Sequence, residues 1–187
     1  MTLEESDHMT ATRLYQNNAK VHFNQHAESK GRFGKRLIYG GHIISLARAA
    51  SFNGLANAFR VLAINGGRHV NPSFAGDTIY AWSEAVDVIE LPGRADLGAL
   101  RLRTIAAKDH PCADFPGPDA AGKYPSEVVL DLDYTILLPR RLACGRCVMS
   151  WSPTWRSWSG GHQAGWLARR RGSRTWICSP AACKTGR

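Results

Sequence analysis

The chain has 187 residues, enough for one domain with a hydrophobic core and too few for two full domains. Its net charge of +9 would favour nucleic acid or an anionic membrane as a partner, but the charge is unevenly distributed. Residues 1–140 hold 15 basic and 15 acidic residues, whereas residues 141–187 hold 9 basic residues and no acid. The composition therefore predicts a near-neutral domain over residues 1–140, followed by a basic tail over residues 141–187.

The start of the chain, MTLEESDHM, is acidic and lacks the basic and apolar regions of a secretory signal peptide. No apolar run elsewhere reaches the length of a membrane span. These features predict a soluble, cytoplasmic protein with no membrane partner.

Helical spacing of apolar residues predicts a first helix from Glu4 to Tyr15, which ends at the turn-forming sequence QNN. A polar loop follows. A second helix is predicted from Gly41 to Phe59, where apolar residues lie on nearly all faces. A helix with that pattern is expected to be buried at the centre of a domain.

Four segments after Phe59 alternate in polarity or are rich in β-branched residues, and each is bounded by Gly, Pro, Asn or Asp. They are RVLAINGGRHV, TIYAWSEAVDVIEL, GALRLRTIAAK and SEVVLDLDYTILL. The sequence LPGRADLG predicts a hairpin connection, and DHPCADFPGPDAAGKYP predicts a long loop or flap. One buried helix followed by four antiparallel strands predicts an α+β domain in which an antiparallel sheet wraps around a central helix.

Three motifs in order, NNAKVHFN, IYGGHIISLARA and NPSFAGDTIYAWSE, resemble those of the MaoC-like dehydratases. That family has the hotdog fold and includes the R-specific enoyl-CoA hydratases. The resemblance runs from about Thr2 to Arg140, and it extends to the second half of members with two hotdog units in tandem. It implies that the chain begins at the first helix and lacks the strand that usually opens a hotdog unit.

The resemblance also implies a function and partners. The expected activity is that of a hydro-lyase, which adds or removes water across the 2,3-double bond of an enoyl-CoA such as mesaconyl-CoA. The CoA thioester is then the substrate, and no cofactor is expected. Hotdog units of this family pair with acyl-CoA lying between them, which implies a homodimer or pairing with another hotdog unit.

The family's catalytic motif places Asp and His five residues apart, and the matching positions here are Asn17 and His22. His22 is the expected general base, because imidazole titrates near neutral pH. Asn17 cannot accept a proton, but its amide can hold a water or orient the imidazole ring. Without the resemblance, His22 would be an ordinary polar residue after a helix and Asn17 a helix C-cap.

Gly40 and Gly41 stand where the second helix begins, and backbone N–H groups at a helix start lack intrahelical acceptors. The resemblance implies that Gly41 donates its N–H to the thioester carbonyl, where negative charge develops. The alternative is that both glycines only allow a tight turn. Asp77 is expected to shape a turn and not to act as a catalytic acid. No metal site is predicted from the remaining histidines of the domain, which are His8, His26, His42, His69 and His110.

The tail contains cysteines at spacings that could suit zinc, namely Cys144, Cys147, Cys178 and Cys183. Together with ARRRGSR and five Trp residues, they make a zinc or nucleic-acid-binding module one alternative. The tail has no acids, repeats or apolar periodicity, so we favour a disordered or non-homologous extension that binds no metal, with nucleic acid disfavoured as a partner. A non-catalytic hotdog unit that only binds or pairs is the other alternative to an enzyme.

Overall fold

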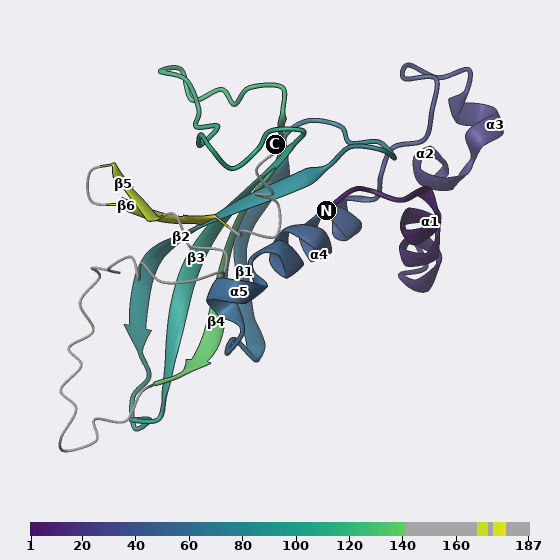
Figure 1. Ribbon diagram of the computed structural model, residues 1–187. Coiled ribbons are helices and arrows are strands. Elements are labelled where there is room, and N and C mark those ends of the chain that lie inside the picture. Colours follow the sequence, from purple (N-terminus) through teal and green to yellow (C-terminus); the bar gives the residue numbers. More distant parts are fainter. Residues whose placement is uncertain (141–167, 172–173, 179–187) are drawn as a thin grey trace, which may run out of the picture.

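Antiparallel strands form one sheet, and helices lie mainly on one side of it (Figure 1). The computed structural model describes residues 1–140, 168–171 and 174–178. The helices are α1 Glu5–Leu14, α2 Lys20–Phe23, α3 Gln25–Glu28, α4 Gly40–Ala50 and α5 Phe52–Leu55. The strands are β1 Arg60–His69, β2 Ile79–Glu90, β3 Leu97–Lys108, β4 Val128–Pro139, β5 Ala168–Arg171 and β6 Arg174–Cys178. Their order in the sheet is β1-β4-β3-β2-β6-β5.

The four strands predicted between residues 60 and 140 are confirmed as β1 to β4. β2 and β3 are joined by a tight turn at residues 91–96, in which Gly93 has a φ of +75°. A left-handed residue at that place needs glycine, because a side chain there would be strained. The long Pro- and Gly-rich segment between β3 and β4 contains no helix or strand in the structure, as predicted.

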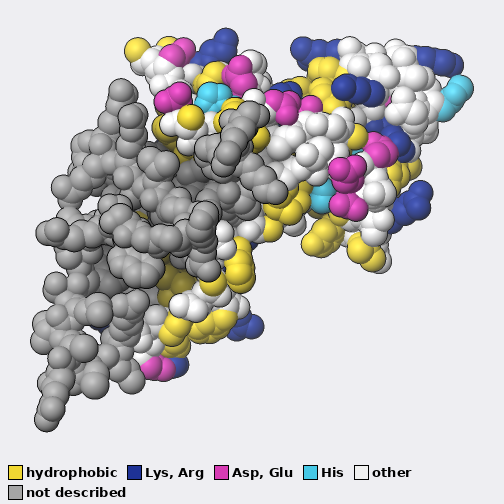
Figure 2. Space-filling model, viewed as in Figure 1, with side chains coloured by type: hydrophobic (Ala, Val, Ile, Leu, Met, Phe, Trp, Pro, Cys, Tyr) yellow, Lys and Arg dark blue, Asp and Glu magenta, His cyan; other side chains and the backbone are white. Residues whose placement is uncertain are grey.

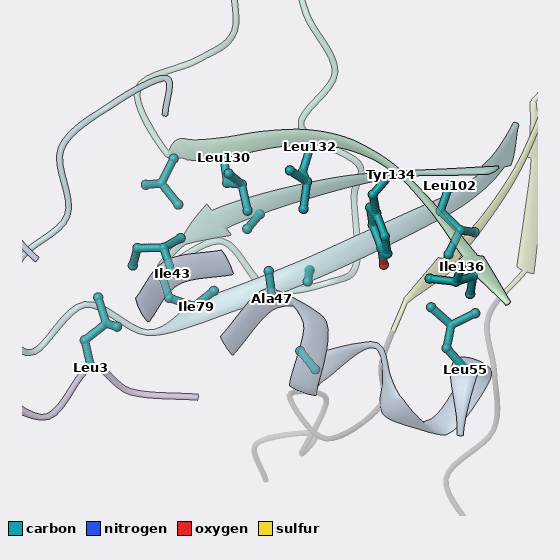
Figure 3. Close-up of a cluster of buried hydrophobic side chains, with 14 of the residues drawn as sticks. Leu3, Ile43, Ala47, Leu55, Ile79, Leu102, Leu130, Leu132, Tyr134 and Ile136 are labelled. Atoms are coloured by element: carbon teal, nitrogen blue, oxygen red, sulfur yellow. The ribbon is translucent and has the colours of Figure 1, made fainter. Parts of the chain in front are cut away.

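Helix α4 packs against β2, β3 and β4 and forms the centre of the core (Figure 3). Its residues Ile43 and Ala47 are buried against side chains that point from β3 and β4. Figure 3 shows Leu102, Leu130, Leu132, Tyr134 and Ile136 directed toward α4 and α5. The antiparallel sheet wrapped around a central helix is therefore confirmed.

The predicted helix from Gly41 to Phe59 is too long. Helix α4 ends at Ala50, where Ser51 donates its hydroxyl to the Ala47 carbonyl at 3.0 Å and occupies the C-cap. The short helix α5 follows, and the chain enters β1 at Arg60. The apolar pattern continues past Ser51 because Leu55 is also buried in the core, although it belongs to a separate helix.

The first three residues lie beside the start of β2. Thr2 forms an isolated antiparallel bridge with Thr78, and the Met1 ammonium donates to the Ile79 carbonyl at 2.8 Å. Leu3 is buried in the core. The first residues of the chain are therefore held against β2 by backbone pairing and by the buried Leu3 side chain.

Two short strands lie within the tail. β6 pairs with β2 at residues 82–84 of β2, and β5 pairs with β6. These two strands do not fit the expectation of a tail without ordered structure. Cys144, Cys147 and Cys183 lie outside the described residues, and the division of the chain at residue 140 stays a prediction. Within the described part of the chain, no helix is both long and apolar enough to cross a membrane.

Candidate active site

A pocket of about 620 Å³ opens between α2, the start of α4 and the end of β1. Two of the three predicted site residues, His22 and Gly41, line it together. The third, Asn17, is not among the residues that line this pocket. The full lining comprises His22, Phe33, Leu37, Ile38, Tyr39, Gly40, Gly41, Ile43, Ile44, His69, Val70, Asn71, Pro72 and Ser73.

The imidazole of His22 has a defined orientation. Its Nδ1 lies 3.0 Å from the carbonyl oxygen of Leu37. A carbonyl oxygen can only accept a hydrogen bond, so Nδ1 carries the proton and Nε2 of the neutral ring keeps its lone pair. Within the described residues Nε2 makes no hydrogen bond, which leaves it able to accept a proton.

Residues 36–37 hold the short helix that carries His22. Leu37 donates its N–H to the Val21 carbonyl at 3.0 Å, and Arg36 donates Nη1 to the Phe23 carbonyl at 3.2 Å. Arg36 also forms an ion pair with Glu5 of α1. A helix as short as α2 has little stability of its own, so these contacts fix its position.

Two aromatic rings flank the His22 imidazole. The Tyr39 ring lies 5.7 Å away and the His8 ring 6.3 Å away, centroid to centroid, both in edge-to-face arrangements. His8 is fully buried, and neither of its ring nitrogens has a hydrogen-bond partner in the described structure. Burial lowers the pKa of His8 to about 4, so the ring is neutral at neutral pH.

The sequence analysis did not identify His8 as a site residue. The polar residues around it are typical of an exposed helix surface, so nothing in the pattern indicated that this histidine is buried. One signal was present, since His8 and Thr12 are one helical turn apart and therefore share a face of α1. Both are fully buried, and the Thr12 hydroxyl donates to the His8 carbonyl at 2.8 Å.

Asn17 supports the turn that leads into α2. Its side-chain oxygen accepts a hydrogen bond from the Ala19 N–H at 2.9 Å, which is a local turn typical of Asn and Asp. The left-handed residue after α1 is Gln16, with a φ of 54°, so the interpretation of Asn17 as the left-handed C-cap is wrong. A direct role for Asn17 in holding water stays a prediction.

Side-chain rings approach Gly40 and Gly41 closely. A Cβ on Gly41 would lie 2.5 Å from Cε1 of Tyr39, and one on Gly40 would lie 2.3 Å from Nε2 of His69. Neither glycine has a positive φ, so a left-handed backbone is not the reason for glycine at these positions, and the tight-turn alternative stays open. The Tyr39 side chain does not cap α4, and within the described residues the N–H groups of both glycines have no acceptor.

His69 is a second pocket histidine that sequence reasoning missed. It ends β1, a strand far from His22 in the chain, so only the fold brings the two residues to one pocket. Burial lowers the pKa of His69 as well. Asp77, in contrast, accepts the Phe74 N–H at 2.9 Å beside Gly76, whose φ is +97°, which agrees with its predicted role in a turn.

Replacing Gly41 with alanine is expected to lower the turnover rate by about 10-fold or more. The new methyl group must push the Tyr39 ring, which packs on His22, and small displacements of a reacting group are costly. Stability should change little, because alanine is favoured over glycine in a helix by up to about 1 kcal/mol. Steady-state rates and melting temperatures measure both effects.

The matched control is Gly98→Ala, where the nearest atoms belong to the flexible Arg140 side chain at 3.3 and 3.4 Å. An unchanged turnover rate for Gly41→Ala would show that the Tyr39 ring does not position His22.

No cluster of three or more His, Cys, Asp or Glu residues that could hold a metal ion occurs in the described part of the chain. Cys144, Cys147 and Cys183 are not described, and only the backbone of Cys178 lies in β6. The zinc alternative for the tail therefore stays untested.

Two curated proteins are similar to this chain. The β-methylmalyl-CoA dehydratase of Chloroflexus aurantiacus is 67% identical over 141 residues, which are 75% of this chain and 40% of that protein. The mesaconyl-CoA hydratase of Cereibacter sphaeroides is 56% identical over 142 residues, covering 75% of this chain and 39% of that protein. This chain thus spans about two fifths of the length of the curated relatives it matches. No protein-family model matches the chain.

A crystal structure of a MaoC-domain dehydratase from Chloroflexus aurantiacus superposes with a TM-score of 0.73 at 67% identity, covering 75% of this chain and 40% of that one. Over three quarters of its length, this chain is similar to a MaoC-domain dehydratase. A Mycobacterium tuberculosis protein with a double hotdog fold is 21% identical, with a TM-score of 0.56, and covers 82% of this chain and 41% of that one. The second likeness supports the hotdog fold of this MaoC-like domain, and the resemblance noted in the sequence motifs is confirmed.

Proposed function

We propose that this MaoC-like domain is a hydratase or dehydratase that acts on the 2,3-double bond of an enoyl-CoA such as mesaconyl-CoA. The observation that carries the proposal is that the free Nε2 side of His22 and the start of α4 with Gly41 line one pocket. The names of the two curated relatives support the same reaction and substrate class. A CoA thioester substrate also fits a cytoplasmic location.

In the hydration direction, Nε2 of His22 accepts a proton from a water while the water oxygen bonds to C3 of the enoyl thioester. The C2–C3 double bond opens, and negative charge moves to the thioester oxygen. The Gly41 N–H, at the positive end of the α4 dipole, stabilises that charge. His22 then returns its proton to C2, so one water is added and no cofactor is required.

We propose further that β1 pairs with another hotdog unit, in a second copy of this chain or in a separate chain. β1 is the edge strand of the sheet, and all ten of its residues are exposed. Val61, Leu62 and Ile64 are exposed by 50%, 45% and 67%, which is unusual for large apolar side chains on a sheet edge. An unpaired strand edge with apolar side chains is a surface suited to β-strand pairing.

The direct test is a steady-state hydration assay on mesaconyl-CoA and crotonyl-CoA, followed by loss of the conjugated thioester absorbance. The protein is assayed alone and together with the part of the Chloroflexus relative that this chain does not cover. We expect activity that rises with pairing, measured alongside by sedimentation. Tight binding of CoA esters with no turnover in either form would favour a non-catalytic hotdog unit.

A further inference from the structure

A group of basic and aromatic side chains lies beside the His22 pocket. Phe33, which lines the pocket, contacts Phe74 edge to face with ring centroids 5.6 Å apart. Lys35 places Nζ 4.2 Å from the centroid of the Phe74 ring, and Lys108 places its Nζ 5.8 Å from the same centroid. The Arg32 guanidinium lies 5.1 Å from the Phe33 ring. We call Arg32, Lys35 and Lys108, with these two rings, the cationic rim.

The positive charge of the cationic rim is only partly balanced. Lys108 lies 3.8 Å from Asp77 and donates to the Pro72 carbonyl at 2.7 Å. Arg32 and Lys35, in contrast, form no ion pair with any residue that the structure describes, and both are exposed. Lysine and arginine side chains gather at the end of the molecule that carries α3 and the loop after it, as Figure 2 shows in dark blue.

The rings restrict where these cations lie. An ammonium group over the face of an aromatic ring gains electrostatic energy and so favours one region of space. The two ammonium groups near the Phe74 ring repel each other, and Asp77, 3.8 Å from Lys108, offsets the charge of only one of them. The arrangement is therefore suited to a ligand that carries several negative charges and reaches into the pocket past Phe33.

We propose that the cationic rim binds the phosphate groups of the CoA moiety, while the acyl end reaches His22. The proposal rests on the proposed function for the identity of the thioester. The CoA moiety carries a diphosphate and a 3′-phosphate, and its acyl thioester stands at the far end of a long uncharged arm. Arg32 suits two-point contact with a phosphate, and Lys35 and Lys108 act as point charges.

The experiment compares mesaconyl-CoA with mesaconyl-pantetheine, which has the same thioester and no phosphate. The double variant Arg32→Gln, Lys35→Gln is expected to raise the Kd for free CoA and the KM for mesaconyl-CoA by about 10-fold or more, as loss of charged hydrogen bonds would. The KM for mesaconyl-pantetheine and the turnover rate for both substrates should stay the same. Binding of CoA to the wild-type protein should weaken with added salt, and more steeply than in the variant.

The control is Arg94→Gln, which removes one positive charge from the turn between β2 and β3. Arg94 pairs there with Asp96 at 2.7 Å, and the turn lies at the opposite end of β2 from Thr78. An equal rise in KM for mesaconyl-CoA and mesaconyl-pantetheine, or no change in the Kd for CoA, would overturn the phosphate site. The control variant should change the Kd for CoA and the KM for mesaconyl-CoA by less than 2-fold. A change as large as that of the double variant would also overturn the phosphate site.

Calorimetric binding of free CoA requires no turnover, so it separates this inference from the proposed function. If the protein turns over no enoyl-CoA but the double variant weakens CoA binding, the phosphate site stands and the hydratase proposal fails. If hydration proceeds and the double variant binds CoA as well as the wild type, the hydratase proposal stands and the phosphate site fails.

Discussion

Replacing His22 with alanine is expected to lower the hydration rate of mesaconyl-CoA by about 100-fold or more, the usual contribution of a positioned general base. Nδ1 of His22 is held by the Leu37 carbonyl, so only Nε2 can exchange a proton with the substrate. Alanine removes that group and leaves the contacts that hold the backbone of α2 in place. The loss should appear in the turnover rate, with little change in the Kd for the CoA ester.

The matched control is His26→Ala, because His26 is an exposed residue on the neighbouring helix α3. Its rate should stay within about 2-fold of the wild type. A loss below about 10-fold for His22→Ala, with the protein folded, would mean that another group performs the proton transfer. The pocket contains one further histidine, His69, and a large effect of His69→Ala would then identify it as that group.

The protein is expected to lose on the order of 3 kcal/mol of unfolding free energy as the pH falls from about 6.5 to about 4. The pKa of His8 is lowered from 6.5 to about 4, mainly by burial; the neighbouring His22, His42 and Arg36 act in the same direction and Glu5 acts in the opposite one. Between these pH values the unfolded chain binds a proton at His8 and the folded chain does not. Stability therefore decreases toward acid throughout this window and is fully present above it.

Urea unfolding at a series of pH values measures this dependence. His8→Phe should flatten the slope between pH 6.5 and 4, because phenylalanine cannot titrate, whereas His26→Phe should leave the slope unchanged. His42 and His69 also have pKa values lowered by burial, so some slope remains in the variant. The pKa values of Asp131 and Asp133 are lowered by their arginine partners, so the loss from those groups comes at more acidic pH. An unchanged slope in His8→Phe would show that the loss of stability toward acid does not come from His8.

The strands could be predicted from the sequence because each has its own alternating or β-branched pattern and its own boundary residues. The end of α4 could not, since Leu55 continues the apolar pattern of the helix although the chain has already turned at Ser51. The paired strands β5 and β6 were not predicted either. Their residues show no alternation, and β6 is a strand in the structure because it pairs with β2, which is a tertiary effect.

The candidate site was only partly predictable. His22 and Gly41 could be found because they lie in local motifs, and the fold brings them to one pocket. His8 and His69 reach the same region from α1 and from the end of β1, and no short motif contains either residue. For Asn17 the position in the motif was clear from the sequence, but its backbone conformation was not. The residue with left-handed backbone after α1 is Gln16.

The bridge between Thr2 and Thr78 has a practical consequence for any polypeptide joined in front of Met1. Because this bridge is antiparallel, an added segment that continued as a strand would run along β2 toward Tyr80 and then Trp82. At Trp82 that edge of β2 already pairs with β6. An amino-terminal tag with high β-propensity would compete with β6 for the same backbone groups, whereas a flexible Gly- and Ser-rich tag would leave the edge as it is.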